Sequence, residues 1–515
     1  MKVVLIRPPL IRPAHHLTAL ETFPPLHLAY LNASLGQYGH QSKIIDGQSS
    51  HQVTHIEDDV RVIVGYTAQE ILDRVPADVE VIGVNCMYTY TWFYDSHIIR
   101  LVKKQFPHVP IIIGGEHASA CADELLAQTP EVSAVVVGEG EYVIPELAQR
   151  LGKGLPVDDL PGVTYRDAQG KPTRAGKKRI MQLDDVPFPS WEGVPLDFYF
   201  QKGAGITQKE KRSIPMIATR GCPHTCSFCT VSSMWNSRWT PRSPENVILE
   251  MKNYYFQFQV THFDFLDLTL VTKKSWVQKF CTLLEKENLP ITWALPIGTR
   301  TEALDGPLLA HMTRTGLTHI MYSAESASED TLQAIQKKLN VDHLTMILKE
   351  SVKCGLVVKL VFVNGFPGQK WKDVLWNWAY IVQGAWIGIH DVVSLGFVPY
   401  PGSTLYDELK AEGRLDKRFE YILLNNDLKG MRSWTKSISD QSLRRISFIS
   451  MSMFYAVQFL FRPQRFLKIC YRFLRGAPPY NNFELIFFNM IKRRLEGVQT
   501  TAQPEPLPRV EQRLS

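Results

Sequence analysis

The stretch "IPMIATRGCPHTCSFC", residues 214–229, joins an apolar, strand-like run to three closely spaced cysteines. Cys222, Cys226 and Cys229 have the spacing C-x3-C-x2-C, whereas the other five of the chain's eight cysteines are scattered. Thiolates are good ligands for soft metal centres, and three of them on one loop form a ligand set. The stretch therefore predicts a metal centre directly after a buried strand.

Zinc and an iron–sulfur cluster are the two candidates for this centre. A structural zinc site needs four protein ligands. His224 lies inside the C-x3-C gap, where its ring is cramped, and no second pair of cysteines is near in sequence. A cubane held by three thiolates instead leaves one iron open to an external ligand. The spacing favours a [4Fe-4S] cluster over zinc.

Residues 206–410 contain six strand-like runs with helix-like segments between them. Six βα units predict a partial (β/α)6 barrel of the TIM type, with its site at the carboxyl ends of the strands. The cysteine loop follows the first of these strands, which places it at the mouth of the barrel. The six strands are expected at residues 215–220, 262–268, 291–298, 319–326, 357–368 and 391–403.

Residues 1–150 also alternate between strand-like and helix-like segments. Their Val/Ile runs are nearly continuous, which is typical of parallel strands buried on both faces. We therefore expect an α/β domain with a doubly wound, Rossmann-like parallel sheet, which binds ligands at its carboxyl strand ends. "GGEH" (114–117) and "GEGE" (138–141) fall at such ends, although glycines also end strands because turns need their conformational freedom. No G-x-G-x-x-G pattern follows the first strand, so a dinucleotide is not expected.

Residues 151–205, with a hairpin-like "YRDAQGKPTR" and several prolines, are expected to form a linker. The amino-terminal "MKVVLIRPPL" has an apolar run too short for a secretory signal, so a cytoplasmic chain is expected. The net charge of +6 is modest and most of it lies near the carboxyl terminus. A nucleic-acid-binding protein would more often spread basic residues over a folded face.

Residues 411–515 are predicted to be a helical region that ends in a disordered tail. Ile446 to Phe461 is apolar but too short and too polar to span a bilayer, and Pro463 ends the run. Two interpretations of residues 444–476 stay open. One is a helix packed on the barrel with a basic outer face; the other is an interfacial helix that rests on anionic lipid.

The second half of the chain resembles the radical S-adenosylmethionine (SAM) family. The resemblance rests on the cysteine spacing with Phe228 before the third cysteine, on "GTR" with Arg300, and on "SAES" and "VNGFPG" further along. It implies that SAM chelates the open iron and is cleaved to a 5′-deoxyadenosyl radical by an electron from a flavodoxin- or ferredoxin-type donor. It also implies that Arg300 faces the carboxylate of SAM, and that Glu325 and Ser326 face its ribose or amino acid end. The alternatives are a structural ion pair for Arg300 and a helix-terminal acid for Glu325.

The first half resembles the cobalamin-binding domain that accompanies one radical SAM subgroup. "PPLHLAYLNASL", "IIIGGEHAS" and "VVVGEGEYVIPELAQ" carry this resemblance, and "QLDDVPFPSW" and "FVPYPGSTLYDEL" extend it to about residue 410. Two departures are visible: "DGQSSH" has Asp46 without a cobalt-ligating histidine two residues on, and "FLDLTL" keeps only Asp267 of a paired acid. The resemblance implies cobalamin contacts for Gly114, Gly115, His117, Gly138, Glu139 and Gly140.

Together the resemblances imply a cobalamin-dependent radical SAM C-methyltransferase, which removes hydrogen from an unactivated carbon of a small molecule and delivers a methyl group from methylcobalamin. A tetrapyrrole, a hopanoid or a secondary metabolite would be a typical substrate. The alternative within the subgroup is an oxidative cyclase without methyl transfer. A methylthiotransferase is disfavoured because the amino-terminal domain has only Cys86 and Cys121, and the cluster motif argues against a cobalamin sensor. Aromatic residues near the expected site would suit a flat substrate or simply pack the core: Tyr88, Tyr90, Trp92, Trp235 and Trp239.

Overall fold

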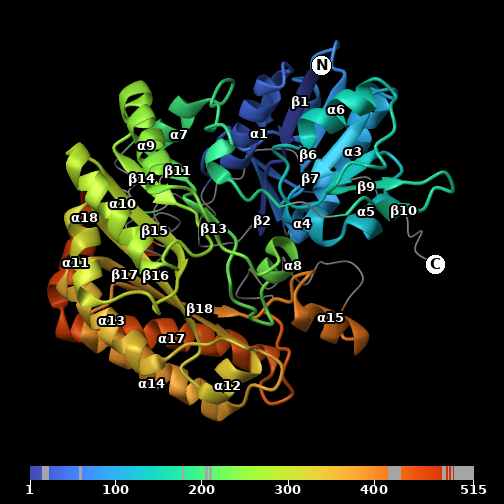
Figure 1. Ribbon diagram of the computed structural model, residues 1–515. Coiled ribbons are helices and arrows are strands. Elements are labelled where there is room, and N and C mark those ends of the chain that lie inside the picture. The colour runs from blue at the N-terminus through green and yellow to red at the C-terminus, as the bar shows by residue number, and fades with distance from the viewer. Residues whose placement is uncertain are drawn as a thin grey trace.

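The computed structural model consists of two α/β units that face each other, followed by carboxyl-terminal helices (Figure 1). It describes residues 1–13, 22–56, 61–176, 179–202, 207, 212–415 and 431–477, together with positions 483, 484, 487, 488 and 491. The predicted disordered tail beyond residue 491 lies outside the described residues.

The amino-terminal unit is built on the predicted parallel sheet. Its parallel strands lie in the order β8 (Ala134–Val136), β7 (Ile111–Gly114), β6 (Val81–Asn85), β1 (Lys2–Arg7) and β3 (Gln41–Asp46). Alternate residues of β1 belong to two different apolar cores, with Leu5 in one and Ile6 in the other. The strands are therefore buried on both faces, as their continuous apolar runs indicate.

Helices cover both faces of this sheet. α1 (Leu26–Gln37) and α6 (Ile144–Gly152) share the core of one face, and α3 (Trp92–Gln105) and α5 (Ala122–Gln128) share the core of the other. The chain reverses its direction of winding between β1 and β6. In such sheets, ligands bind in the crevice at this switch point, at the carboxyl ends of the strands.

Two small elements add to this unit beyond the prediction. β2 (Leu10–Pro13), β5 (Arg61–Val64) and β4 (Val53–His55) form a separate antiparallel sheet. The hairpin of β9 (Val163–Arg166) and β10 (Pro172–Arg174) was expected in a linker. Instead β9 pairs antiparallel with β8 and buries Val163 completely. The hairpin covers what would otherwise be an exposed sheet edge.

The second unit contains the six predicted strands, each parallel to its neighbours. Their order is β11 (Ser213–Met216), β14 (His262–Phe265), β15 (Thr292–Thr299), β16 (Leu317–Glu325), β17 (Val357–Asn364) and β18 (Asp391–Gly396). Because β11 and β18 do not pair, the barrel is partial. This confirms the predicted (β/α)6 architecture.

Three of the helices between these strands begin where the sequence supplies a capping side chain. The helices include α9 (Pro244–Phe258), α10 (Lys274–Glu287), α11 (Gly306–Arg314), α13 (Val341–Lys353) and α14 (Trp371–Ile387). The side chains of Ser243, Asp305 and Asn340 accept hydrogen bonds from backbone amides in the first turns of α9, α11 and α13. Such caps satisfy amide groups that would otherwise lack a partner.

The carboxyl-terminal helices are α15 (Thr404–Ala411), α17 (Asp440–Phe461) and α18 (Pro463–Leu474). α17 packs along α14 and β18 (Figure 1). Trp378 donates to Ser450 Oγ at 3.0 Å, and Tyr455 donates to Asp391 at 2.5 Å. These contacts support the interpretation of residues 444–476 as a helix packed on the barrel.

Two arginines of residues 444–476 cap the carboxyl end of α14. Arg462 donates to the carbonyl oxygens of Ala385 and Trp386 at 3.0 and 2.9 Å. Arg465 donates to those of Gly388 and Ile389, both at 2.8 Å. Helix carbonyls at this end have no intrahelical partner, so the contacts cap α14. Within the described part of the chain, no helix is long and apolar enough to cross a membrane.

Candidate functional site

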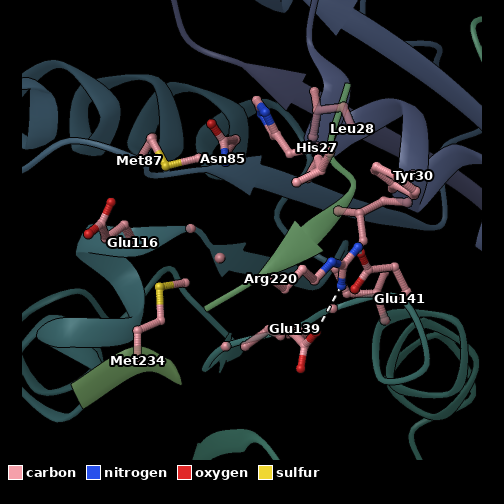
Figure 2. Close-up of a pocket in the computed structure, with 18 of the residues that line it drawn as sticks. His27, Leu28, Tyr30, Asn85, Met87, Glu116, Glu139, Glu141, Arg220 and Met234 are labelled. Atoms are coloured by element: carbon pink, nitrogen blue, oxygen red, sulfur yellow. Dashed lines mark hydrogen bonds and ion pairs between the residues drawn. The ribbon is translucent and has the colours of Figure 1, made fainter. Parts of the chain in front are cut away.

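A cavity of about 380 Å³ lies between the two units, where the strand ends of the first meet the loop after β11 of the second (Figure 2). Its deep end, which we call the apolar slot, opens between the sheet and helices α1 and α6. Leu5, Gly83 and Ile112 are neighbours in register on β1, β6 and β7. A Cβ atom on Gly83 would lie 3.0 Å from Leu5 Cδ2, so the glycine keeps the slot open. The slot is lined by Leu5, Leu28, Leu31, Gly83, Ile112, Val136 and Ile144.

The mouth of the cavity receives side chains from both units. From the first unit come Asn85 at the end of β6, His27 at the start of α1 and Glu116 at the start of α4 (Glu116–Ala120). Met234 and Trp235 come from α8 (Val231–Trp235) of the second unit. Figure 2 shows Met87 and Met234 on facing walls. Neither unit closes this cavity alone.

The predicted glycines all lie on the cavity wall: Gly114, Gly115, Gly138 and Gly140. Gly115 has φ +117°, and a Cβ atom there would lie 2.6 Å from the carbonyl oxygen of Cys86. Gly138 has φ +88°, a conformation that favours glycine. Glycines at the strand ends leave room for a broad macrocycle, and the apolar slot beyond them suits an aromatic base that the macrocycle carries on a tail. The residues present therefore fit cobalamin.

The histidine on the wall is His27, not His117. The His117 ring is buried, shares a 3.1 Å hydrogen bond between Nδ1 and Thr89 Oγ1, and is not part of the cavity lining. Burial lowers its pKa to about 4. Burial, with the Arg7 charge, lowers the pKa of His27 to about 3, while a hydrogen bond to Asn85 opposes this. The sequence offered one indication that His27 lies on the wall: it stands at the start of α1, beside the switch point of the sheet.

The turn "DGQSSH" contributes no imidazole to the cavity. Gln48 occupies the position two residues after Asp46 and donates to the carbonyl oxygen of Pro8 at 3.3 Å. It is buried and is not part of the cavity lining. Asp46 itself accepts a hydrogen bond from Tyr199 and lies 3.6 Å from Arg7.

An ion network of Glu139, Glu141, Arg179 and Arg220 joins the two units beside the cavity; we call it the junction network. Arg220 Nη1 lies 2.9 Å from Glu139 Oε1, and its Nη2 lies 2.5 Å from Glu141 Oε1 (Figure 2). Arg179 Nε lies 2.9 Å from the other oxygen of Glu139. Burial alone would lower the pKa of Arg220, but the two carboxylates outweigh it and raise that pKa. The network was not predicted from the sequence.

The cysteine loop begins at a short strand, β12 (Thr219–Arg220), that pairs with β13 (Thr240–Pro241). Asp267 accepts hydrogen bonds from the backbone amides of Ala218 and Thr219 and from the Thr219 hydroxyl. The one acid kept from the pair thus holds the start of this loop. Gly221 has φ +78°, and a Cβ atom there would lie 1.9 Å from the carbonyl oxygen of Arg238. Only glycine allows this close approach.

The three cysteines of the loop are free and partly buried. Burial raises the pKa of Cys222 and raises that of Cys229 to about 11, whereas the Arg300 and Lys337 charges lower that of Cys222. Metal ligands must be thiolates, which nearby cations stabilise. No three His, Cys, Asp or Glu side chains of the described residues are arranged to hold a single ion. The fit to a cluster rests on three free thiols at the barrel mouth beside two cations.

Arg300 and Glu325 lie near this loop, each in an ion pair. Arg300 Nη1 is 3.9 Å from Cys226 Sγ, and its Nε donates to Glu302 at 3.0 Å. Glu325 lies 3.0 Å from Lys337, and both side chains are buried. Glu325 also has φ +62°, an unfavourable conformation for this residue type that is often found at functional sites.

Ser326 and Phe228 have packing roles in the structure. The Ser326 hydroxyl is fully buried and donates to Asn377 Oδ1 on α14 at 3.0 Å. The hydroxyl is thus engaged by the neighbouring helix. Phe228 packs on Phe366, with ring centroids 5.6 Å apart. Of the aromatic candidates, Trp235 lines the cavity and Tyr90 is buried in an apolar cluster with Phe366.

Two family models match the two units. The B12 binding domain matches residues 16–148, and the radical SAM superfamily matches residues 216–375. The chain belongs to the radical SAM enzymes that carry a cobalamin-binding domain. Its cofactors are a [4Fe-4S] cluster, SAM and cobalamin.

Known relatives match this radical SAM enzyme over most of its length. An uncharacterised methyltransferase of Pyrococcus horikoshii is 26% identical over 437 residues, 85% of this chain and 86% of the relative. An anaerobic magnesium-protoporphyrin IX monomethyl ester cyclase of Rubrivivax gelatinosus is 24% identical over 419 residues, 78% of this chain and 69% of the cyclase. The structure of the radical SAM methyltransferase TsrM from Kitasatospora setae, with cobalamin and a [4Fe-4S] cluster bound, aligns with a TM-score of 0.61. That alignment has 14% identity and covers 80% of this chain and 78% of TsrM.

Proposed function

We propose that this radical SAM enzyme is a cobalamin-dependent C-methyltransferase that acts on a small-molecule substrate. One observation carries the proposal: the strand ends of the cobalamin-binding unit line the same cavity as Gly221 and Val231, which flank the cysteine motif, while the three cysteines themselves lie outside the lining. A group held by the first unit and a group held by the loop would meet across this single space. The methyltransferases among the relatives support the same reaction class.

When bound, the cluster with SAM supplies a 5′-deoxyadenosyl radical, and cobalamin supplies a transferable methyl group; the protein positions both. We propose that Cys222, Cys226 and Cys229 hold the cluster. Arg300 and the Glu325–Lys337 pair would orient the charged end of SAM beside it. The apolar slot would take the tail of cobalamin, and the buried junction network would exclude water from one side of the cavity.

An external electron donor of the flavodoxin or ferredoxin type would approach the outer side of the cysteine loop. Pro223 and Thr225 are exposed there, between the cluster ligands Cys222 and Cys226. A peripheral membrane contact of residues 444–476 is a separate proposal. It would use exposed residues such as Leu467 and Leu474, because Arg462 and Arg465 are bound to α14.

The experiment that tests methyl transfer starts from the metabolites of a strain that lacks the gene. We expect a compound there that is lighter than the normal product by one methyl group. Incubated anaerobically with the reconstituted holoenzyme, a reductant and SAM labelled in its methyl group, this compound should acquire the label. Equal amounts of S-adenosylhomocysteine and 5′-deoxyadenosine should appear with the product. An accumulated compound that does not differ from the product by a methyl group, and whose conversion yields 5′-deoxyadenosine without S-adenosylhomocysteine, would instead identify the cyclase type of reaction.

A further inference from the structure

The loop that carries the cysteines is a hairpin whose two stems are tied to the same carboxylate of the other unit. β12 leads into the loop and β13 leads out of it, with Arg220 paired to Thr240 across the ladder. Arg220, at the first stem, lies 2.9 Å from Glu139 Oε1. Arg179 lies 2.9 Å from Glu139 Oε2. The Ile180 amide donates a hydrogen bond to the same oxygen at 2.8 Å. Arg220 and the Arg179–Ile180 segment therefore engage opposite oxygens of Glu139.

Arg179 carries the connection to the second stem. Its Nη1 donates to the carbonyl oxygen of Trp235 at 2.7 Å, and its Nη2 donates to Thr240 Oγ1 at 3.4 Å. Its guanidinium also lies 4.7 Å from the centre of the Trp235 ring. Trp235 ends α8, which follows Cys229, and Thr240 belongs to β13. One arginine thus links Glu139 to both segments that return from the cysteines.

The geometry of these contacts suits a role in positioning the cysteine loop better than a role in stabilising the fold. Buried ion pairs contribute little net stability because desolvation opposes them, but planar guanidinium groups fix the direction of their partners. The Glu139 side chain is 1% exposed and that of Arg220 is 8% exposed. Glu139 also lies in the loop after β8 that lines the cofactor cavity. The carboxylate therefore belongs to the cobalamin wall and to the cysteine hairpin at once.

We propose that Glu139 is a positioning residue, which fixes the cluster-bearing hairpin relative to the cobalamin-binding unit through Arg220 and Arg179. The inference rests on the proposed function for the identity of the two groups that are aligned. Glu141, which contacts only Arg220 within the network, supports the first stem alone.

The test compares hydrogen exchange of the loop amides, residues 222–239, in the cobalamin-loaded, reconstituted protein. Glu139→Gln should speed exchange throughout this loop by about tenfold, because one uncharged amide replaces the anchor of two buried arginines. The matched control is Asp46→Asn, which breaks the buried Arg7–Asp46 pair in the same unit. It should leave exchange of residues 222–239 as in the wild type.

Arg179→Lys is the second variant, for the case that Glu139→Gln does not fold. This variant keeps the positive charge but loses the planar guanidinium group, so faster exchange should be confined to residues 230–239. Electron paramagnetic resonance of the same samples gives the spin relaxation of Co(II) caused by the reduced cluster, which depends on the distance between the two centres. A loop with several positions should give heterogeneous relaxation in Glu139→Gln, whereas relaxation should stay uniform in Asp46→Asn. Wild-type loop exchange in both Glu139→Gln and Arg179→Lys would overturn the proposal. So would an equal effect of Asp46→Asn. Neither readout requires turnover, so the outcome is separate from whether the enzyme transfers a methyl group.

Discussion

Substitution of Gly83 by valine tests whether the apolar slot holds the tail of cobalamin. Gly83 lies in the middle of β6, between its register partners Leu5 and Ile112. A Cβ atom would already lie 3.0 Å from Leu5 Cδ2, and the two further methyl groups of valine would enter the slot. Valine suits a strand, so the variant should fold. Overpacking of this kind costs about 1–3 kcal/mol once the slot is filled.

A cost of about 1–3 kcal/mol raises the dissociation constant for cobalamin about 5- to 150-fold. Anaerobic equilibrium dialysis of the cluster-loaded protein against hydroxocobalamin measures this directly. The matched control is Gly36→Ala in α1, where no atom lies within 4 Å of the added Cβ and the helix should gain up to about 1 kcal/mol. Both variants should keep their iron and cleave SAM. Wild-type cobalamin affinity in Gly83→Val would refute the assignment of the slot.

Three further predictions concern the cysteine loop and the carboxyl-terminal helices. Alanine at Cys222, Cys226 or Cys229 should prevent binding of the cubane cluster, which contains about four irons, and should abolish formation of 5′-deoxyadenosine. Cys281→Ala, at a buried thiol within α10, should keep the wild-type iron content and the wild-type formation of 5′-deoxyadenosine. Burial raises the pKa of Asp267 to about 6, so the native state holds its proton more tightly than the unfolded chain, and stability falls as pH rises from about 4 to 6. The free energy of unfolding of Asp267→Asn should therefore rise by about 3 kcal/mol relative to that of the wild type as the pH goes from 4 to 7. A difference between the melting temperatures of the two proteins that stays constant across this pH range would contradict the burial argument. Arg465→Gln removes a charged hydrogen bond at the end of α14, which contributes about 1.5–3 kcal/mol, and should therefore lower the melting temperature. It should leave co-sedimentation with anionic vesicles unchanged, and a loss of vesicle binding would show that Arg465 contacts lipid instead.

Both α/β units were predictable because their patterns are local. Continuous Val/Ile runs, capping residues and the cysteine spacing each lie within a few residues of sequence. The glycines of the strand ends were predictable for the same reason, since the turn after a buried parallel strand and the ligand crevice fall at the same place. The resemblance to a known family then supplied the cofactors, which residue patterns alone left open.

Side-chain partners were less predictable because they depend on contacts between distant segments. Glu139 and Arg220 are 81 positions apart, so no local pattern shows that the glutamate binds an arginine. Ser326 follows the strand end that was expected near SAM, but its hydroxyl is taken by Asn377, 51 positions further on. His117 lies in a glycine-marked turn, yet the short helix after Gly115 carries its ring away from the cavity towards Thr89.

The arrangement of the units explains why the cavity carries so few charges of its own. Each unit presents the carboxyl ends of its strands to the other, so the polar strand-end groups of both meet at one junction. Within the described residues, the charged side chains of the cavity wall are Glu116, Glu139, Glu141 and Arg220. Three of these pair with each other, and Glu116 accepts a hydrogen bond from Thr230 of the cysteine loop. These charged groups are therefore engaged in fixing one unit relative to the other, and most of the remaining wall is apolar.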